Sequence, residues 1–90
     1  MKIDVYDSYA QTSKGIMHFD VFVESGTSSE QAFKFGRLWL SSIGENEGSL
    51  DQSHCNFCHS KIAKPEVKQQ IAEYGYYIFT MEGCPRSISH

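Results

Sequence analysis

Hydrophobic and polar residues alternate along the first quarter of the chain, as they do in β-strands that bury one face. In residues 2–10, Ile3, Val5 and Tyr9 share one face. In residues 16–23 the alternation is stronger. One face carries Met17, Phe19, Val21 and Val23, and the opposite face carries Ile16, His18, Asp20 and Phe22. Because Ser13-Lys14-Gly15 between them is a turn signal, the pattern predicts a β-hairpin of residues 2–10 and 16–23.

The hydrophobic spacing then changes to the period of an α-helix. Thr27-Ser28-Ser29-Glu30 resembles a capping box, and Gly44 is a stop signal, so a helix is predicted over residues 29–43. Its apolar arc contains Ala32, Phe33, Phe35, Trp39, Leu40 and Ile43. Gly36 lies within this arc, where a bare backbone permits close approach to a sheet at a cost of about 1 kcal/mol in helix propensity.

The second half of the chain supplies weaker patterns. Residues 49–55 predict a short strand, and a cysteine-rich loop follows it. Pro65 suits the first turn of a second helix, which Gly75 ends. Residues 76–81 are apolar on both faces and predict a central strand. The resulting β-β-α-β-α-β order predicts an α+β fold of two layers, with the helices on one face of a mainly antiparallel or mixed sheet.

Length and charge limit the kinds of protein that this can be. Ninety residues, 40% of them hydrophobic and 13% aromatic, predict a single packed domain over residues 1–90. The net charge is −3 and the eight Lys and Arg are scattered, which argues against nucleic acid and against an anionic membrane. The N-terminus lacks a signal-peptide pattern, so a cytoplasmic protein with reduced thiols is expected. The odd number of cysteines, three, agrees with this expectation.

His54-Cys55-Asn56-Phe57-Cys58-His59 is the densest chemical stretch of the chain. A C-x-x-C pair can place two thiolates on one tetrahedral zinc ion. Cys55 and Cys58 have this spacing, His59 or His54 could add a nitrogen, and Cys84 a third sulfur. The candidate metal ligands are therefore Cys55, Cys58, His59 and Cys84, with zinc as the candidate cofactor.

Three other interpretations fit the same residues. A reduced C-x-x-C can cycle as a redox pair. A helix N-terminus next to the first cysteine would lower its thiol pKa, but the second helix is predicted to begin several residues further along the chain. The pattern also matches C-x-x-C-H haem attachment, which we reject because that chemistry requires export. The simplest interpretation is that Cys55, Phe57 and Cys58 pack under the second helix, since free cysteine behaves as a small apolar group.

His18 and Asp20 point to the same side of their strand. An Asp can orient an imidazole, and such pairs serve in acid–base catalysis. No motif ties a Ser or Cys nucleophile to them, so a polar pair on the exposed face of an antiparallel sheet is the favoured interpretation.

The segments MHFDVFV, CNFCHS and YGYYIFTMEGCP occur in this order. Together they resemble a small, mostly bacterial family catalogued as a domain of unknown function, number two-zero-two-four. The resemblance implies a compact α+β domain and supplies no activity. The sequence thus predicts a binding or interaction module without an assignable reaction, compatible with a homodimer. The alternative is a zinc-binding or thiol-redox protein that uses the Cys55-x-x-Cys58-His59 segment.

Overall fold

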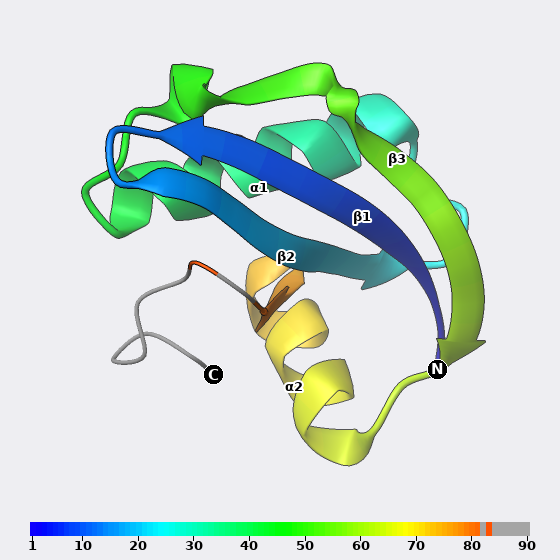
Figure 1. Cartoon of the computed structure of the whole chain (residues 1–90). Coiled ribbons are helices and arrows are strands. Elements are labelled where there is room, and N and C mark those ends of the chain that lie inside the picture. The colour runs from blue at the N-terminus through cyan, green and yellow to red at the C-terminus, as the bar shows by residue number, and fades with distance from the viewer. Residues whose placement is uncertain (82, 84–90) are drawn as a thin grey trace.

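The computed structural model describes residues 1–81 and residue 83 (Figure 1). The elements follow in the order β1 (Lys2–Thr12), β2 (Gly15–Glu24), α1 (Ser29–Ser42), the 3-10 helix η1 (Glu47–Ser49), β3 (Leu50–Ile62), α2 (Pro65–Tyr74) and β4 (Tyr77–Thr80). This order confirms the predicted α+β class and the predicted β-β-α-β-α-β succession. Among the described residues, no helix has the length and apolar character needed to cross a membrane.

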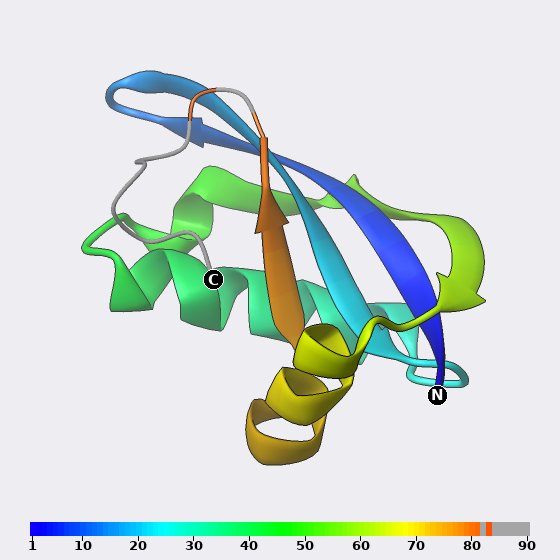
Figure 2. The ribbon, with the colours of Figure 1, turned by 90° about the horizontal axis from the view of Figure 1, so that it is seen from below.

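The described strands form one sheet in the order β3-β1-β2-β4, and every neighbouring pair is antiparallel. The tight turn at residues 13 and 14 pairs Thr12 with Gly15 and so places Asp7 opposite Asp20. The prediction that residues 76–81 form a central strand is wrong, because β4 lies at an edge beside β2 (Figure 2). Its two faces are apolar because Ile78 joins one hydrophobic cluster and Tyr77 packs against the other.

Helix α1 lies behind β1 and β2 in Figure 1 and covers one face of the sheet. Ser28 caps it by accepting a hydrogen bond from the Gln31 backbone N–H, and Gly44 follows its end at φ 83°. A Cβ at Gly36 would lie only 2.7 Å from Leu50 Cδ2, which confirms the predicted close approach. The hairpin strands β1 and β2 contribute Tyr6, Ala10, Met17, Phe19, Val21 and Val23 to this core, and the helix contributes Ala32, Trp39 and Leu40.

The structure differs from the expectation of helices on a single face, because α2 packs against the other side of the sheet. Its Val67 and Ile71 form a second cluster with Ile3, Val5 and Phe22, whose positions alternate with those of the α1 core. The strand residues of this second cluster lie at one end of the sheet, where α2 shields them from solvent. The short connection of residues 63–64 after β3 places α2 against them. We call this side of the sheet the α2 face.

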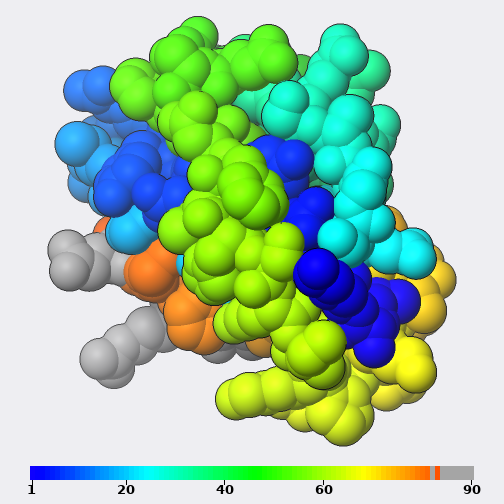
Figure 3. Space-filling model, turned by 90° about the vertical axis from the view of Figure 1, so that its right-hand side faces the viewer, coloured from blue at the N-terminus to red at the C-terminus, as the bar shows by residue number. Residues whose placement is uncertain are grey.

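Strand β3 extends well beyond the predicted residues 49–55 and includes the whole cysteine-rich stretch. It is an edge strand that pairs only with β1 among the described strands. In Figure 3 its residues form a band down one side of the molecule, which agrees with the exposure of most of its side chains. Its pairing with β1 shifts register twice, between Val5 and Tyr6 and between Ser8 and Ala10.

Candidate metal centre

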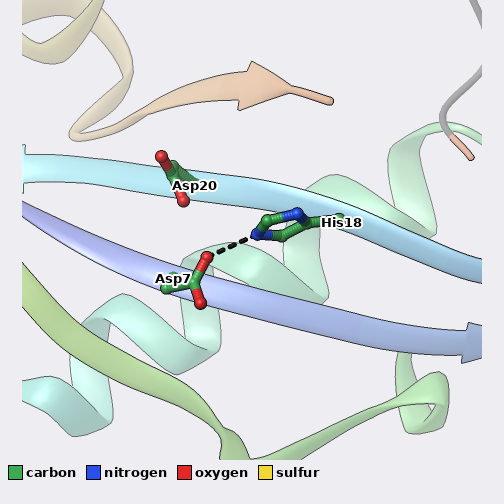
Figure 4. Close-up of side chains that lie close together, drawn as sticks. All are labelled: Asp7, His18 and Asp20. Atoms are coloured by element: carbon green, nitrogen blue, oxygen red, sulfur yellow. Dashed lines mark hydrogen bonds and ion pairs between the residues drawn. The ribbon is translucent and has the colours of Figure 1, made fainter. Parts of the chain in front are cut away.

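Beyond the end that α2 covers, the α2 face carries a group of polar side chains on its two central strands. Asp7 comes from β1, and His18 and Asp20 come from β2 (Figure 4). Each offers one ligand atom, and the three atoms all lie within 4.8 Å of one another. All three side chains are partly buried. We call these residues the carboxylate–histidine cluster.

The regular alternation of the hairpin positions these residues. Asp7 and Asp20 are directly opposite each other, and Tyr9 is opposite His18. His18 Nε2 lies 2.5 Å from Asp7 Oδ1. The Tyr9 ring stacks on the imidazole with ring centroids 4.2 Å apart, so one side of the imidazole ring is covered.

The carboxyl group of Asp20 has a raised pKa. Burial, then the charge of Asp7 and a hydrogen bond with it, raise the pKa of Asp20 to about 6, while His18 and His59 act in the opposite direction. Phe79 of β4 is directly opposite Asp20 on the side away from Asp7. Two carboxylates that face each other across neighbouring strands repel. A proton shared between them, or a cation bound by both, would relieve this repulsion.

The predicted zinc ligands occupy different environments. Cys55 lies opposite Ser8 and is buried in the α1 core, where the Ser8 hydroxyl donates to its sulfur at 3.4 Å. Burial raises the pKa of the Cys55 thiol. Cys58 is exposed and falls at a register shift, between partners of Val5 and Tyr6.

Cys58 and His59 are brought together, since Cys58 Sγ is 3.2 Å from His59 Nδ1. Cys55, Cys58 and His59 do not form a group of three converging ligands within residues 1–81 and 83. The segment is an extended strand and lacks the turn by which a C-x-x-C pair usually holds zinc. Cys84 lies outside the described residues, so the four-ligand zinc site stays a prediction.

Sequence reasoning found His18 and Asp20 as neighbours but missed Asp7. The signal was present, because the two-residue turn at positions 13 and 14 fixes the hairpin register. Counting outward from Thr12 and Gly15 puts Asp7 opposite Asp20.

The fold and the cluster together define a small α+β domain with ionisable groups on the α2 face of its sheet. The model of the family described as Domain of unknown function (DUF2024) matches residues 1–81, so this chain belongs to that family. The chain is also similar to a solved NMR structure, that of protein NE1680 from Nitrosomonas europaea, described as a structural genomics target. The two are 44% identical with a TM-score of 0.81, and the match covers 94% of this chain and 100% of the other. No curated protein matches the chain.

Proposed function

We propose that this protein is a small binding module whose ligand is a divalent transition-metal ion, held by the carboxylate–histidine cluster of Asp7, His18 and Asp20. The observation that carries the proposal is the convergence of two carboxylates and one imidazole, within 4.8 Å of one another, on the two central strands. Strands of a hairpin are rigid supports, and a site built on them holds its geometry better than one built on loops.

The electrostatics of the cluster support a cation. Asp7 and Asp20 face each other directly, and like charges in that position are destabilising. A proton on Asp20 relieves the repulsion only at acidic pH, because its pKa is about 6. At neutral pH a divalent cation would neutralise both carboxylates at once.

The dimensions also support an ion. Zinc bonds to nitrogen and oxygen are about 2.0–2.1 Å long, so two ligand atoms on a tetrahedral ion lie roughly 3.4 Å apart. The present separations, at most 4.8 Å, need only small side-chain rotations to reach this value. Two carboxylates and one imidazole suit zinc, manganese or iron(II). Three protein ligands would leave a coordination position for water or for a group from a partner.

Titration calorimetry on metal-depleted protein with Zn²⁺ and, separately, Mn²⁺ tests the proposal. We expect Asp7→Asn and Asp20→Asn each to weaken binding at least about ten-fold, because even the loss of a group that only orients a metal ligand costs about 10–100-fold in affinity. Asp51→Asn is the matched control, because Asp51 is an exposed carboxylate on β3 away from the cluster. Absence of binding, or equal binding by the two cluster variants and wild type, would overturn the proposal.

A second candidate is a thiol-dependent or zinc-binding function at Cys58 and His59. It is favoured by the 3.2 Å separation of Cys58 Sγ from His59 Nδ1. Reduced thiols are required for either role, so this candidate supports a cytoplasmic setting. The same titration separates the two candidates. Cys58→Ser leaves metal binding unchanged if the carboxylate–histidine cluster holds the ion, and abolishes binding if the cysteine segment does.

A further inference from the structure

We propose a second binding site, for a small neutral molecule that carries a flat aromatic ring. It is the cavity of about 540 Å³ between the C-terminal ends of α1 and α2 and strand β4. This volume falls within the range of small-molecule sites, about 300–1,000 Å³. The site shares no residue with the carboxylate–histidine cluster, so it stands independently of the proposed metal function.

The floor of the cavity is apolar and firmly packed. Trp39 and Ile78 form it and are only 5% and 6% exposed. The Trp39 ring contacts the fully buried Phe19, with ring centroids 4.8 Å apart. A ligand therefore meets a preformed surface and does not have to order it, which favours binding.

An aromatic ring that the core holds in place forms one wall. Tyr76 lines the cavity and stacks on Phe35 with ring centroids 4.9 Å apart, whereas the Tyr77 ring packs on Phe22 on the α2 face of the sheet. Burial raises the pKa of the Tyr76 hydroxyl, which stays a neutral hydrogen-bonding group at physiological pH. Flat ligand rings pack favourably in offset-stacked or edge-to-face contact with such a wall.

Gly75 lets the chain place cavity-lining tyrosines on both sides of one turn. Its φ of 92° ends α2 and leads directly into β4, so Tyr74 and Tyr76 both line the cavity. A Cβ at this position would come within 3.0 Å of the Phe35 ring. Both the backbone conformation and the close contact therefore require glycine here.

The lining chemistry selects a neutral ligand. None of the described lining residues carries a formal charge, so an ionic ligand would lose its hydration without gaining a counter-ion. The Ser42 hydroxyl already donates to the Trp39 carbonyl oxygen. The Gln70 amide and the tyrosine hydroxyls are the groups that can bond a polar edge of the ligand.

The probe for the test is the neutral fluorescent amine N-phenylnaphthylamine. Trp39 is the single tryptophan of the chain and lies in the floor of the cavity, so energy transfer from it reports binding of the probe to the protein, and the variants below localise that binding. We expect a saturable rise in probe emission with matching loss of Trp39 emission. Anilinonaphthalene sulfonate has the same ring system with a negative charge, and we expect it to bind at least about ten-fold more weakly because no lining group compensates the charge.

Gln70→Arg places a cation at the cavity and should reverse the preference towards the sulfonated probe. Gln69→Arg is the matched control, because Gln69 is an exposed neighbour on the same helix that does not line the cavity. Tyr74→Ala removes a ring that is 60% exposed at the rim and should weaken the neutral probe several-fold without unfolding the protein. Circular dichroism checks the fold of each variant. The proposal fails if the neutral probe leaves Trp39 emission unchanged, or if Gln70→Arg and Gln69→Arg act alike.

Discussion

At the scale of single residues, the two cysteines of the C-x-x-C segment have opposite chemical characters. Cys55 is 4% exposed, and its sulfur accepts a hydrogen bond from Ser8. Its burial raises the pKa of the thiol and so lowers the fraction of reactive thiolate. Cys58 is exposed beside an imidazole. Only the second of them has the access that a reactive thiol needs.

This contrast predicts thiol reactivity. In a Cys84→Ser background at pH 8, we expect Cys58 to react with an aromatic disulfide reagent at once. Cys55 should react roughly a hundred-fold more slowly, because it needs a local opening of the core. Absorbance of the released thiol measures both phases, and denaturant should merge them. Cys58→Ser is the control that leaves only the slow phase, and two fast native thiols would contradict the prediction.

At the scale of elements, the contact between α1 and β3 depends on a single missing side chain. A Cβ at Gly36 would lie 2.7 Å from Leu50 Cδ2, 3.5 Å from Val21 Cγ2 and 3.7 Å from the Phe19 ring. Leu50 is fully buried, so its methyl group has little room to turn away. Helix propensity favours alanine at position 36, whereas packing favours glycine.

We expect packing to win in Gly36→Ala. Overpacking of a dense core costs about 1–3 kcal/mol, against a gain of about 1 kcal/mol in helix propensity. Urea denaturation should therefore show a lower free energy of unfolding for this variant. Ser41→Ala on the exposed side of the same helix is the control and should be neutral or slightly stabilising. A Gly36→Ala protein as stable as wild type would show that α1 can move away from the sheet.

Local signals predicted the elements that carry them. The boundary signals at Ser28, Gly44, Pro65 and Gly75 all lie at helix ends in the structure. The full length of β3 was not predicted, because an edge strand with mostly exposed side chains has no hydrophobic alternation to read. The edge position of β4 was also missed. Its two apolar faces suggested a central strand, but α1 and α2 pack on opposite sides of it.

At the scale of the whole molecule, the stability of the sheet is coupled to the ionisation of Asp20. Asp7 faces it from β1, His18 lies beside it on β2, and His59 acts on it from β3. Its pKa is about 6 in the folded protein, against 3.8 for an unperturbed group. The folded state therefore binds the proton more tightly than the unfolded state. This contribution to stability is complete below about pH 4 and is lost as the pH rises through 6.

We therefore expect the free energy of unfolding of the metal-free protein to fall between pH 4 and about pH 7. Asp20→Asn should lack this part of the decrease and be more stable than wild type at pH 8, by roughly 1 kcal/mol once solvent screening is allowed for. Urea denaturation across the pH range measures the difference, and Asp51→Asn should retain the wild-type decrease. Parallel pH curves for wild type and Asp20→Asn would contradict the coupling.

The homodimer stays a prediction, which analytical ultracentrifugation of the native protein tests.

The sequence by itself determined the hairpin, both helices, the α+β order and the resemblance to the family, because periodicity, caps and tight turns act between residues close along the chain. Only the tertiary structure decided that α2 covers the opposite face from α1, that β3 buries Cys55 and exposes Cys58, and that β4 lies at the edge beside Asp20. These outcomes depend on register and packing between segments far apart along the chain. Alternation within one strand says which side chains share a face, but not which neighbours that face will meet.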